Sequence, residues 1–182
     1  MLAALLLQLA LLAPADSAAA RRASPRGDEA MSVHAQRIES GIKVDGYLND
    51  PAWATAPTIS SFTQREPQEG QAATQRTAVR VLFDDGNLYV AAELFDTSPD
   101  SIISLLERRD RFVNADQFMV MLDPYHDKRS GYYFGVNAAG TLYDGTLFND
   151  EWDDDSWDGV WSAATHRGAH GWTVEMRVPF SQ

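Results

Sequence analysis

The stretch from residue 144 to residue 158 holds the densest group of chemically active side chains. Its carboxylates, with no basic residue among them, are Asp144, Asp150, Glu151, Asp153, Asp154, Asp155 and Asp158. Carboxylates packed together repel one another, and a hard cation that takes oxygen ligands relieves that repulsion. The composition favours a calcium ion (Ca2+) bound by Asp150, Asp153 and Asp155. The spacing does not fit a twelve-residue EF-hand loop, and a solvated acidic loop without an ion is the alternative.

Tryptophans in the same stretch suggest a second kind of chemistry. A sugar ring lays its apolar face on an aromatic side chain while carboxylates and amides bond its hydroxyls. Trp152 and Trp157 are flanked by charge, so we expect them to be exposed and able to stack on a sugar. Trp161 follows Val160 in a predicted strand, and we expect it to lie in the core.

Catalytic chemistry has weaker support. Glycoside hydrolysis needs two carboxylates held about 5 to 10 Å apart. Glu151 and Asp155 could be given those roles, but an acidic loop supplies no rigid geometry, so we expect no catalysis in this chain. His126, His166 and His170 lack the regular spacing of zinc ligands.

Composition sets the frame for these side chains. A chain of 182 residues with 45% hydrophobic content favours one globular domain. A formal charge of -11 would repel a phosphate backbone, so we expect no nucleic-acid partner. Residues 1–20 have the pattern of a signal peptide, which predicts export to the periplasm, outer membrane or cell exterior. Residues 21–37 are polar and predict a flexible lead-in, and the absence of cysteine excludes disulfides.

The remaining residues predict an all-β fold, an antiparallel β-sandwich of the jelly-roll kind, with one or two short helices. Strand patterns cover 42–47, 77–83, 88–95, 118–122, 132–136 and 172–178. The polar loop 84–87 predicts a hairpin, and 172–178 alternates most regularly between apolar and polar side chains. Helices are predicted after Asp50-Pro51 and over 99–109, where the basic tail 108–111 reads as a solvated face. No strand follows 172–178, so we expect that strand at an exposed edge and a domain truncated at its C-terminus.

Several of these segments resemble the carbohydrate-binding module family 9 domains. The opening phrase Val-Asp-Gly-x-Leu-x-Asp-x-x-Trp runs from Val44 to Trp53, and Leu88-Tyr89-Val90 follows the predicted hairpin turn. Asp116 opens a strand that ends in Asp123-Pro124, and its neighbour ends in Val-Asn at Asn137. The resemblance implies a non-catalytic β-sandwich over 38–182 that attaches exported enzymes to sugars, and it favours calcium.

The sugar-gripping residues of that family match less well than the scaffold. Asp116 and Asn137 match family positions, and the resemblance implies that they bond sugar hydroxyls. Met119 stands where the family has a glutamate, and Phe112-Val113 stands where it has a clamping tryptophan. A second clamping tryptophan would lie beyond Gln182.

This variant pattern looks most like family 9-like domains at the N-terminus of bacterial outer-membrane β-barrel proteins. Membrane contact would then occur only through a barrel after Gln182. We therefore expect a domain that binds an oligosaccharide or polysaccharide through Trp152, Trp157, Asp116 and Asn137. The alternatives are a periplasmic interaction or plug domain that no longer binds sugar, and an accessory module of a glycoside hydrolase in carbohydrate catabolism.

Overall fold

The structure, a computed structural model, describes residues 34–149 and 152–182, with only the backbone of Trp152. The predicted signal peptide, most of the lead-in, Asp150 and Glu151 lie outside the described residues. Within the described ranges, no helix is long and apolar enough to cross a membrane.

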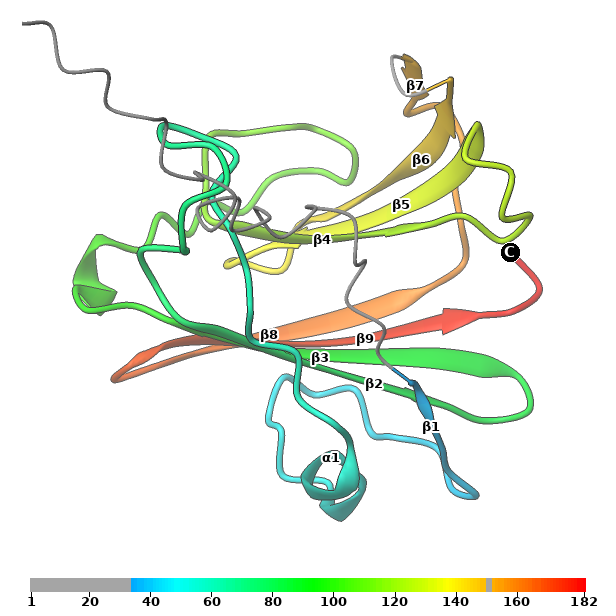
Figure 1. Ribbon diagram of the computed structural model, residues 1–182, viewed down its shortest axis with the longest axis horizontal. Helices are drawn as coiled ribbons and strands as arrows, with labels where there is room; N and C mark the ends of the chain where they lie inside the picture. Colours follow the sequence, from blue (N-terminus) through cyan, green and yellow to red (C-terminus); the bar gives the residue numbers. More distant parts are fainter. Residues whose placement is uncertain (1–33, 150–151) are drawn as a thin grey trace, which may run out of the picture. The chain divides into compact units, whose positions relative to one another are not determined.

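Two sheets face each other, which confirms the predicted all-β sandwich (Figure 1). The five-stranded sheet has the order β1-β2-β3-β9-β8, and the four-stranded sheet has the order β4-β5-β6-β7. All pairings are antiparallel except that of β1 with β2. The strands are β1 (Gln36–Arg37), β2 (Thr77–Phe83), β3 (Asn87–Phe95), β4 (Gln117–Leu122), β5 (Ser130–Asn137), β6 (Leu142–Phe148), β7 (Trp152–Asp154), β8 (Ser162–Gly168) and β9 (Gly171–Pro179).

The main core lies between the two sheets. Strand alternation sends every second side chain of β9 inward, and Trp172, Val174, Met176 and Val178 are all buried there, as predicted. Phe134 and Val136 of β5 meet them from the four-stranded sheet. Trp161 is 8% exposed and belongs to the same core, which confirms its predicted place.

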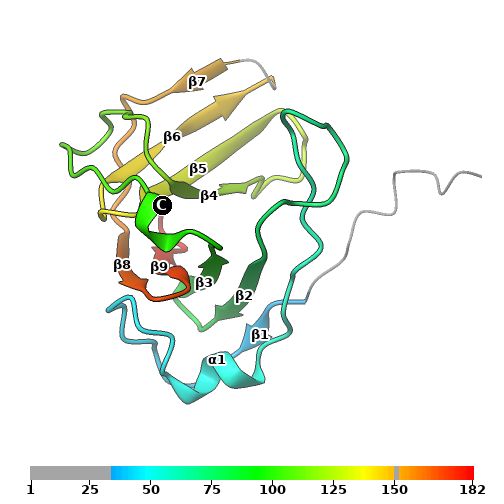
Figure 2. The same cartoon turned by 90° about the vertical axis from the view of Figure 1, so that its left-hand side faces the viewer.

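A second apolar cluster covers the outer face of the five-stranded sheet. The helix α1 (Pro51–Thr55) lies beside this sheet, on the side away from the four-stranded sheet (Figure 2). Its Trp53 packs in one cluster with Leu82, Tyr89 and Ala91. We call residues 38–56 the N-terminal cap. Trp53 is therefore buried, and it lies on the outer face of the five-stranded sheet rather than between the two sheets.

Glu175 of β9 fastens the N-terminal cap to the sheet. Its carboxylate accepts hydrogen bonds from the backbone N–H groups of Asp45 and Gly46, both at 2.9 Å, and from Trp53 Nε1 at 2.8 Å. Burial raises the pKa of Glu175, against the opposing effect of these hydrogen bonds. The strand predicted over 42–47 is wrong, because the backbone here bonds to a side chain instead of to a neighbouring strand.

Three other sequence-based expectations differ from the structure. The predicted helix over 99–109 is a single 3-10 turn, η2 (Pro99–Ser101), followed by extended chain. The strand predicted at an exposed edge, β9, is paired on both sides, by β3 and β8. Gln36 and Arg37, assigned to the lead-in, pair with Leu82 and Phe83, so the ordered sheet begins two residues earlier than predicted.

Candidate functional site

The outer face of the four-stranded sheet is the candidate site. The side chains of Phe118, Val120 and Leu122 pack on the sandwich core, so the alternating residues between them face outward. This rule and the strand register give the outward residues as Gln117, Met119, Met121, Gly131, Tyr133, Gly135, Asn137, Tyr143, Gly145, Leu147 and Asp153.

One end of this face, where the family 9 gripping positions fall, is filled by apolar side chains. Met119 pairs with Gly135, and a Cβ on that glycine would stand 3.2 Å from the terminal methyl of Met119. The ring of Phe112 lies 4.7 Å from the ring of Tyr143, and Phe112 is 56% exposed. The methionine and phenylalanine thus provide apolar contact where the family resemblance implied a carboxylate and a tryptophan.

Asn137 and Asp116 lie near this end, and both hold backbone in place. Asn137 is fully buried, and its amide oxygen accepts the N–H groups of Ala139 and Thr141 at 2.9 and 3.0 Å. Its amide nitrogen donates to Leu105 O at 2.7 Å. Asp116 accepts the N–H of Ile103 at 2.7 Å. The bonds to Ile103 and Leu105 tie the chain after η2 to the sheet. Both polar atoms of the Asn137 amide and one carboxylate oxygen of Asp116 are therefore engaged within the protein.

The other end of the face is hollow and open. A depression of about 450 Å³ lies there, and we call it the outer hollow. Its lining is Arg65, Met121, Leu122, Asp123, Lys128, Arg129, Ser130, Gly131, Leu147 and Asp153. Met121 and Leu147 provide apolar surface, and Gly131 has no side chain to fill the space between them. Charged side chains of both signs surround this apolar floor.

The loop between β4 and β5 shapes one side of the outer hollow. Asp123 accepts the N–H groups of Asp127 and Lys128 at 3.2 and 2.8 Å. Asp127 accepts the N–H groups of Arg129 and Ser130 at 2.8 and 2.9 Å, and these bonds lower the pKa of its carboxyl. Lys128 has a φ of 56°, a left-handed conformation that non-glycine residues seldom adopt. The carboxylates of Asp123 and Asp127 therefore fix the conformation of the loop that carries the basic residues Lys128 and Arg129.

Tyr133 of β5 lies next to the outer hollow and is paired with Gly145 of β6. Its ring lies where a Cβ on Gly145 would come within 2.6 Å, so the glycine makes room for it. Burial, followed by the negative charges of Asp153 and Asp155, raises the pKa of Tyr133 to about 12. The phenol is therefore neutral at physiological pH.

The predicted stacking tryptophans are placed differently from expectation. The side chain of Trp152 lies outside the described residues. Trp157 is half-buried, with its ring 4.9 Å from Tyr132 and 6.0 Å from Phe134. Because Phe134 and Tyr132 belong to the core side of the sheet, Trp157 packs with core aromatics instead of standing on an exposed loop.

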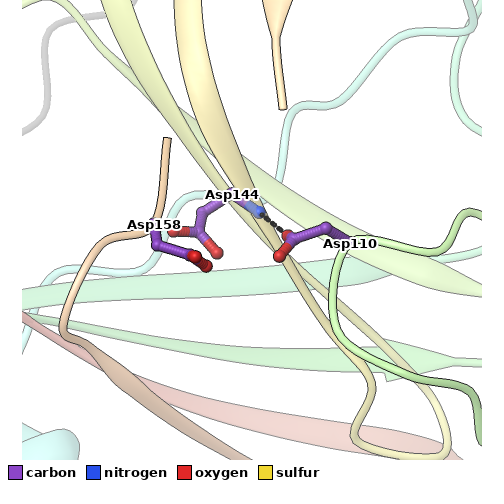
Figure 3. A group of neighbouring side chains, drawn as sticks. All are labelled: Asp110, Asp144 and Asp158. Carbon is purple, nitrogen blue, oxygen red and sulfur yellow. Dashed lines mark hydrogen bonds between the residues drawn. The ribbon is translucent and has the colours of Figure 1, made fainter. Parts of the chain in front are cut away.

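The acidic stretch is also organised differently. Asp144 lies in β6 with no exposed surface, not in a loop, and β7 occupies another part of the stretch. Figure 3 shows the carboxyl groups of Asp110, Asp144 and Asp158 pointing toward one another, with the Asp144 N–H donating to Asp110 at 3.0 Å. Among the described residues, this is the group of three acids whose oxygens lie within 4.8 Å of one another.

Arg109 already pairs with this group. Its guanidinium donates to Asp144 Oδ1 at 2.8 Å through Nε and to Gly159 O at 2.6 Å through Nη2. It also lies 3.4 Å from Asp110 and 3.3 Å from Asp158. A cation here would have to displace the guanidinium, so these acids do not fit a calcium site. The basic segment 108–111, predicted to be a solvated face, thus contains Arg109, which pairs with the buried carboxylate of Asp144.

The residues predicted to bind calcium lie elsewhere. Asp150 is outside the described residues, and Asp153 and Asp155 are exposed. Between them, Asp154 accepts the N–H of Ser156 at 2.9 Å and also its hydroxyl, so its carboxylate closes a turn. Calcium binding by Asp153 and Asp155 stays a prediction.

Comparisons with known proteins add the family. Among curated protein sequences, none matches this chain. The chain resembles a solved carbohydrate binding module family 9 from Caldicellulosiruptor kristjanssonii in complex with cellotriose, with 17% identity over 83% of this chain and 69% of that chain, at a TM-score of 0.59. A module of this family from the same organism in complex with glucose gives 18% identity over 81% and 70% of the two chains, at 0.57. These likenesses show the fold. A family model described as "Carbohydrate family 9 binding domain-like" matches residues 44–182. Since that match spans most of the sequence, this chain belongs to the carbohydrate family 9 binding domain-like family.

Proposed function

We propose that this domain is non-catalytic and binds carbohydrate in the outer hollow. The observation that carries the proposal is the shape of that hollow, an apolar floor of Met121, Gly131 and Leu147 inside a charged rim. A sugar ring has the same division, because its faces are apolar and its edge carries hydroxyl groups that bond to charged side chains. Family membership and the saccharides bound by the solved structures support the same function.

The test is isothermal titration of the folded domain with glucose, cellotriose and other neutral and charged oligosaccharides. Asp153→Asn removes a rim charge from the hollow and should weaken binding by at least about fivefold, since a hydrogen bond to a charged group is worth about 1.5–3 kcal/mol. Asp100→Asn is the matched control, because Asp100 is exposed and does not line the hollow. Equal loss in both variants, or no loss in either, would contradict this placement of the site.

A second candidate function is an interaction domain that has kept the scaffold and lost sugar binding. The observation that favours it is the apolar packing of Met119, Gly135 and Phe112 where the family grips its ligand. A folded sample that gives no heat with any saccharide, with or without calcium, would select this candidate. We propose in either case that the domain acts outside the cytoplasm as part of a cell-envelope protein, on the strength of the signal-like pattern over 1–20.

Calcium dependence has a separate test. If Asp153 and Asp155 hold Ca2+, millimolar calcium should raise the melting temperature and a chelator should reverse the rise. Asp155→Asn should reduce the response. A melting temperature that calcium does not change would remove the ion from this proposal.

A further inference from the structure

We infer that the outer hollow selects an acidic saccharide, one whose sugar units carry a carboxylate. This inference rests on the proposed function and adds the class of sugar to it. It is carried by the charges around the hollow.

Basic side chains are scarce in this protein but gather at this depression. The chain has 15 lysines and arginines against 26 acidic residues. Three of those basic residues, Arg65, Lys128 and Arg129, line the outer hollow. An acidic protein repels acidic ligands at long range, so a local group of cations is needed to bind one.

Among the described residues, none of these three cations forms an ion pair. The ion pairs that the described residues form involve other basic side chains, namely Arg37, Lys43, Arg80, Arg109 and Arg111. Lys128 and Arg129 are exposed, and Arg65 is exposed on the turn at 64–71, which is closed by the Gly70 N–H donating to Gln64 O at 2.9 Å.

The acidic residue beside these cations does not cancel them fully. Asp123 also lines the hollow, but its carboxylate accepts the backbone N–H groups of Asp127 and Lys128. It therefore fixes the loop in the shape that presents Lys128 and Arg129. A planar guanidinium such as that of Arg129 can then bond a ligand carboxylate through two parallel hydrogen bonds.

The remaining acid defines the orientation of the ligand. Asp153 lies on β7, paired with Leu147 of β6, which in turn pairs with Gly131 of β5. Strands in a sheet are about 4.8 Å apart, so Asp153 stands roughly 10 Å across the sheet from the β5 side of the hollow. A sugar carboxylate would lie toward Lys128 and Arg129, and hydroxyl groups would lie toward Asp153. The apolar floor supports the ring between them.

The experiment compares trigalacturonate with galactotriose, its neutral counterpart, by isothermal titration at 20 mM and 300 mM salt. We expect at least about tenfold tighter binding of the acidic sugar at low salt and a smaller advantage at high salt, because salt screens exposed charges. Arg129→Gln and Lys128→Gln should each weaken the binding of trigalacturonate more than that of galactotriose, and so remove most of the advantage of the acidic sugar. Arg108→Gln is the control, since Arg108 is exposed and lies outside the hollow.

The outcomes separate this inference from the proposed function. Equal binding of the two sugars, or an acidic preference that the Arg129 and Lys128 variants retain, overturns the inference and leaves carbohydrate binding intact. Citrate that competes as well as trigalacturonate also overturns it, because the hollow would then bind any carboxylate. No binding of either sugar, with cellotriose and glucose also silent, refutes the proposed function itself. Tryptophan fluorescence of each variant checks that it is folded.

Discussion

Replacing Arg109 with methionine should destabilise the domain strongly. The change keeps an unbranched side chain but removes the guanidinium that bonds Asp144 and Gly159 O. The side chain of Asp144 has no exposed surface, so its charge would lose its partner without gaining water. Asp110 and Asp158 also lie within 4 Å of the guanidinium in the wild type. Without it, they would repel the Asp144 carboxylate with no positive charge to compensate.

The size of the effect follows from burial. Breaking a buried ion pair by removing one partner costs about 3–5 kcal/mol. Arg109 is 35% exposed, so water already shares part of its charge and the lower end, about 3 kcal/mol, applies. With a urea dependence of about 2 kcal/mol per molar, the unfolding midpoint should fall by about 1.5 M. Tryptophan fluorescence during urea unfolding measures this directly, because Trp161 and Trp172 are buried in the core.

The matched control is Arg111→Met. Arg111 is 72% exposed and lies 4.0 Å from Glu107, so its loss should change the stability very little. The reasoning would be refuted if both variants unfolded at the same urea concentration. A further check is the double variant with Asp144→Asn, which removes the buried charge and should recover part of the lost stability. If that second change lowered stability by its full separate cost, the two groups would not be coupled.

Three further predictions concern burial and space. Glu175→Gln should lower stability, because an amide offers fewer acceptors to its three donors, one of them Trp53. The folded-state pKa of Glu175 is raised above 4.5. The stability that this shift contributes is therefore complete below pH 4.5 and falls as the pH rises. The difference in unfolding free energy between wild type and Glu175→Gln should narrow when the pH is raised from 4 to 7. Urea midpoints measured across that range test this, and a gap that widens would contradict it. Gly145→Ala places a methyl 2.5 Å from Asp154 O and 2.6 Å from the Tyr133 ring. The substitution should lower the free energy of unfolding by about 1–3 kcal/mol in the same assay. An unchanged urea midpoint would mean that β7 moves freely. Tyr133 favours its neutral form up to a pKa of about 12, so wild-type stability should decrease between pH 10 and pH 12 more steeply than that of Tyr133→Phe, and parallel alkaline unfolding curves would disprove the shift.

Local patterns were sufficient to predict much of this fold. The hairpin of β2 and β3 was predictable because its turn chemistry is local: Asp84 accepts the N–H groups of Gly86 and Asn87 at 2.8 and 2.7 Å. The alternation in β9 also lies within one segment, and its inward face was identified correctly. The same alternation places Glu175 on the opposite face of the strand, but it does not reveal what covers that face. The N-terminal cap covers it, and that cap is more than a hundred residues away in sequence.

The site was harder to predict because its interactions join distant segments. The apolar spacing over 99–109 fits a helix, but the extended chain there bonds to sheet side chains, such as Asn137 with Leu105 O. The sequence pattern predicts Asp144 in an acidic loop, whereas in the structure Arg109 of that extended chain bonds to it. No local pattern relates those two residues. The outer hollow likewise depends on how β4, β5, β6 and β7 are aligned with one another, and local sequence patterns do not reveal that register.

The interior position of β9 in its sheet has a consequence for how the molecule reaches its native state. This strand, the last along the described chain, lies between β3 and β8. Until it is synthesised and inserted, one backbone edge of β3 has no strand to pair with, and Glu175 cannot accept hydrogen bonds from its three donors in residues 45–53. Such long-range closure is slow, and it leaves unpaired strand edges exposed in the meantime. A growing chain would therefore depend on being kept from aggregating until nearly all of this domain has emerged from the ribosome.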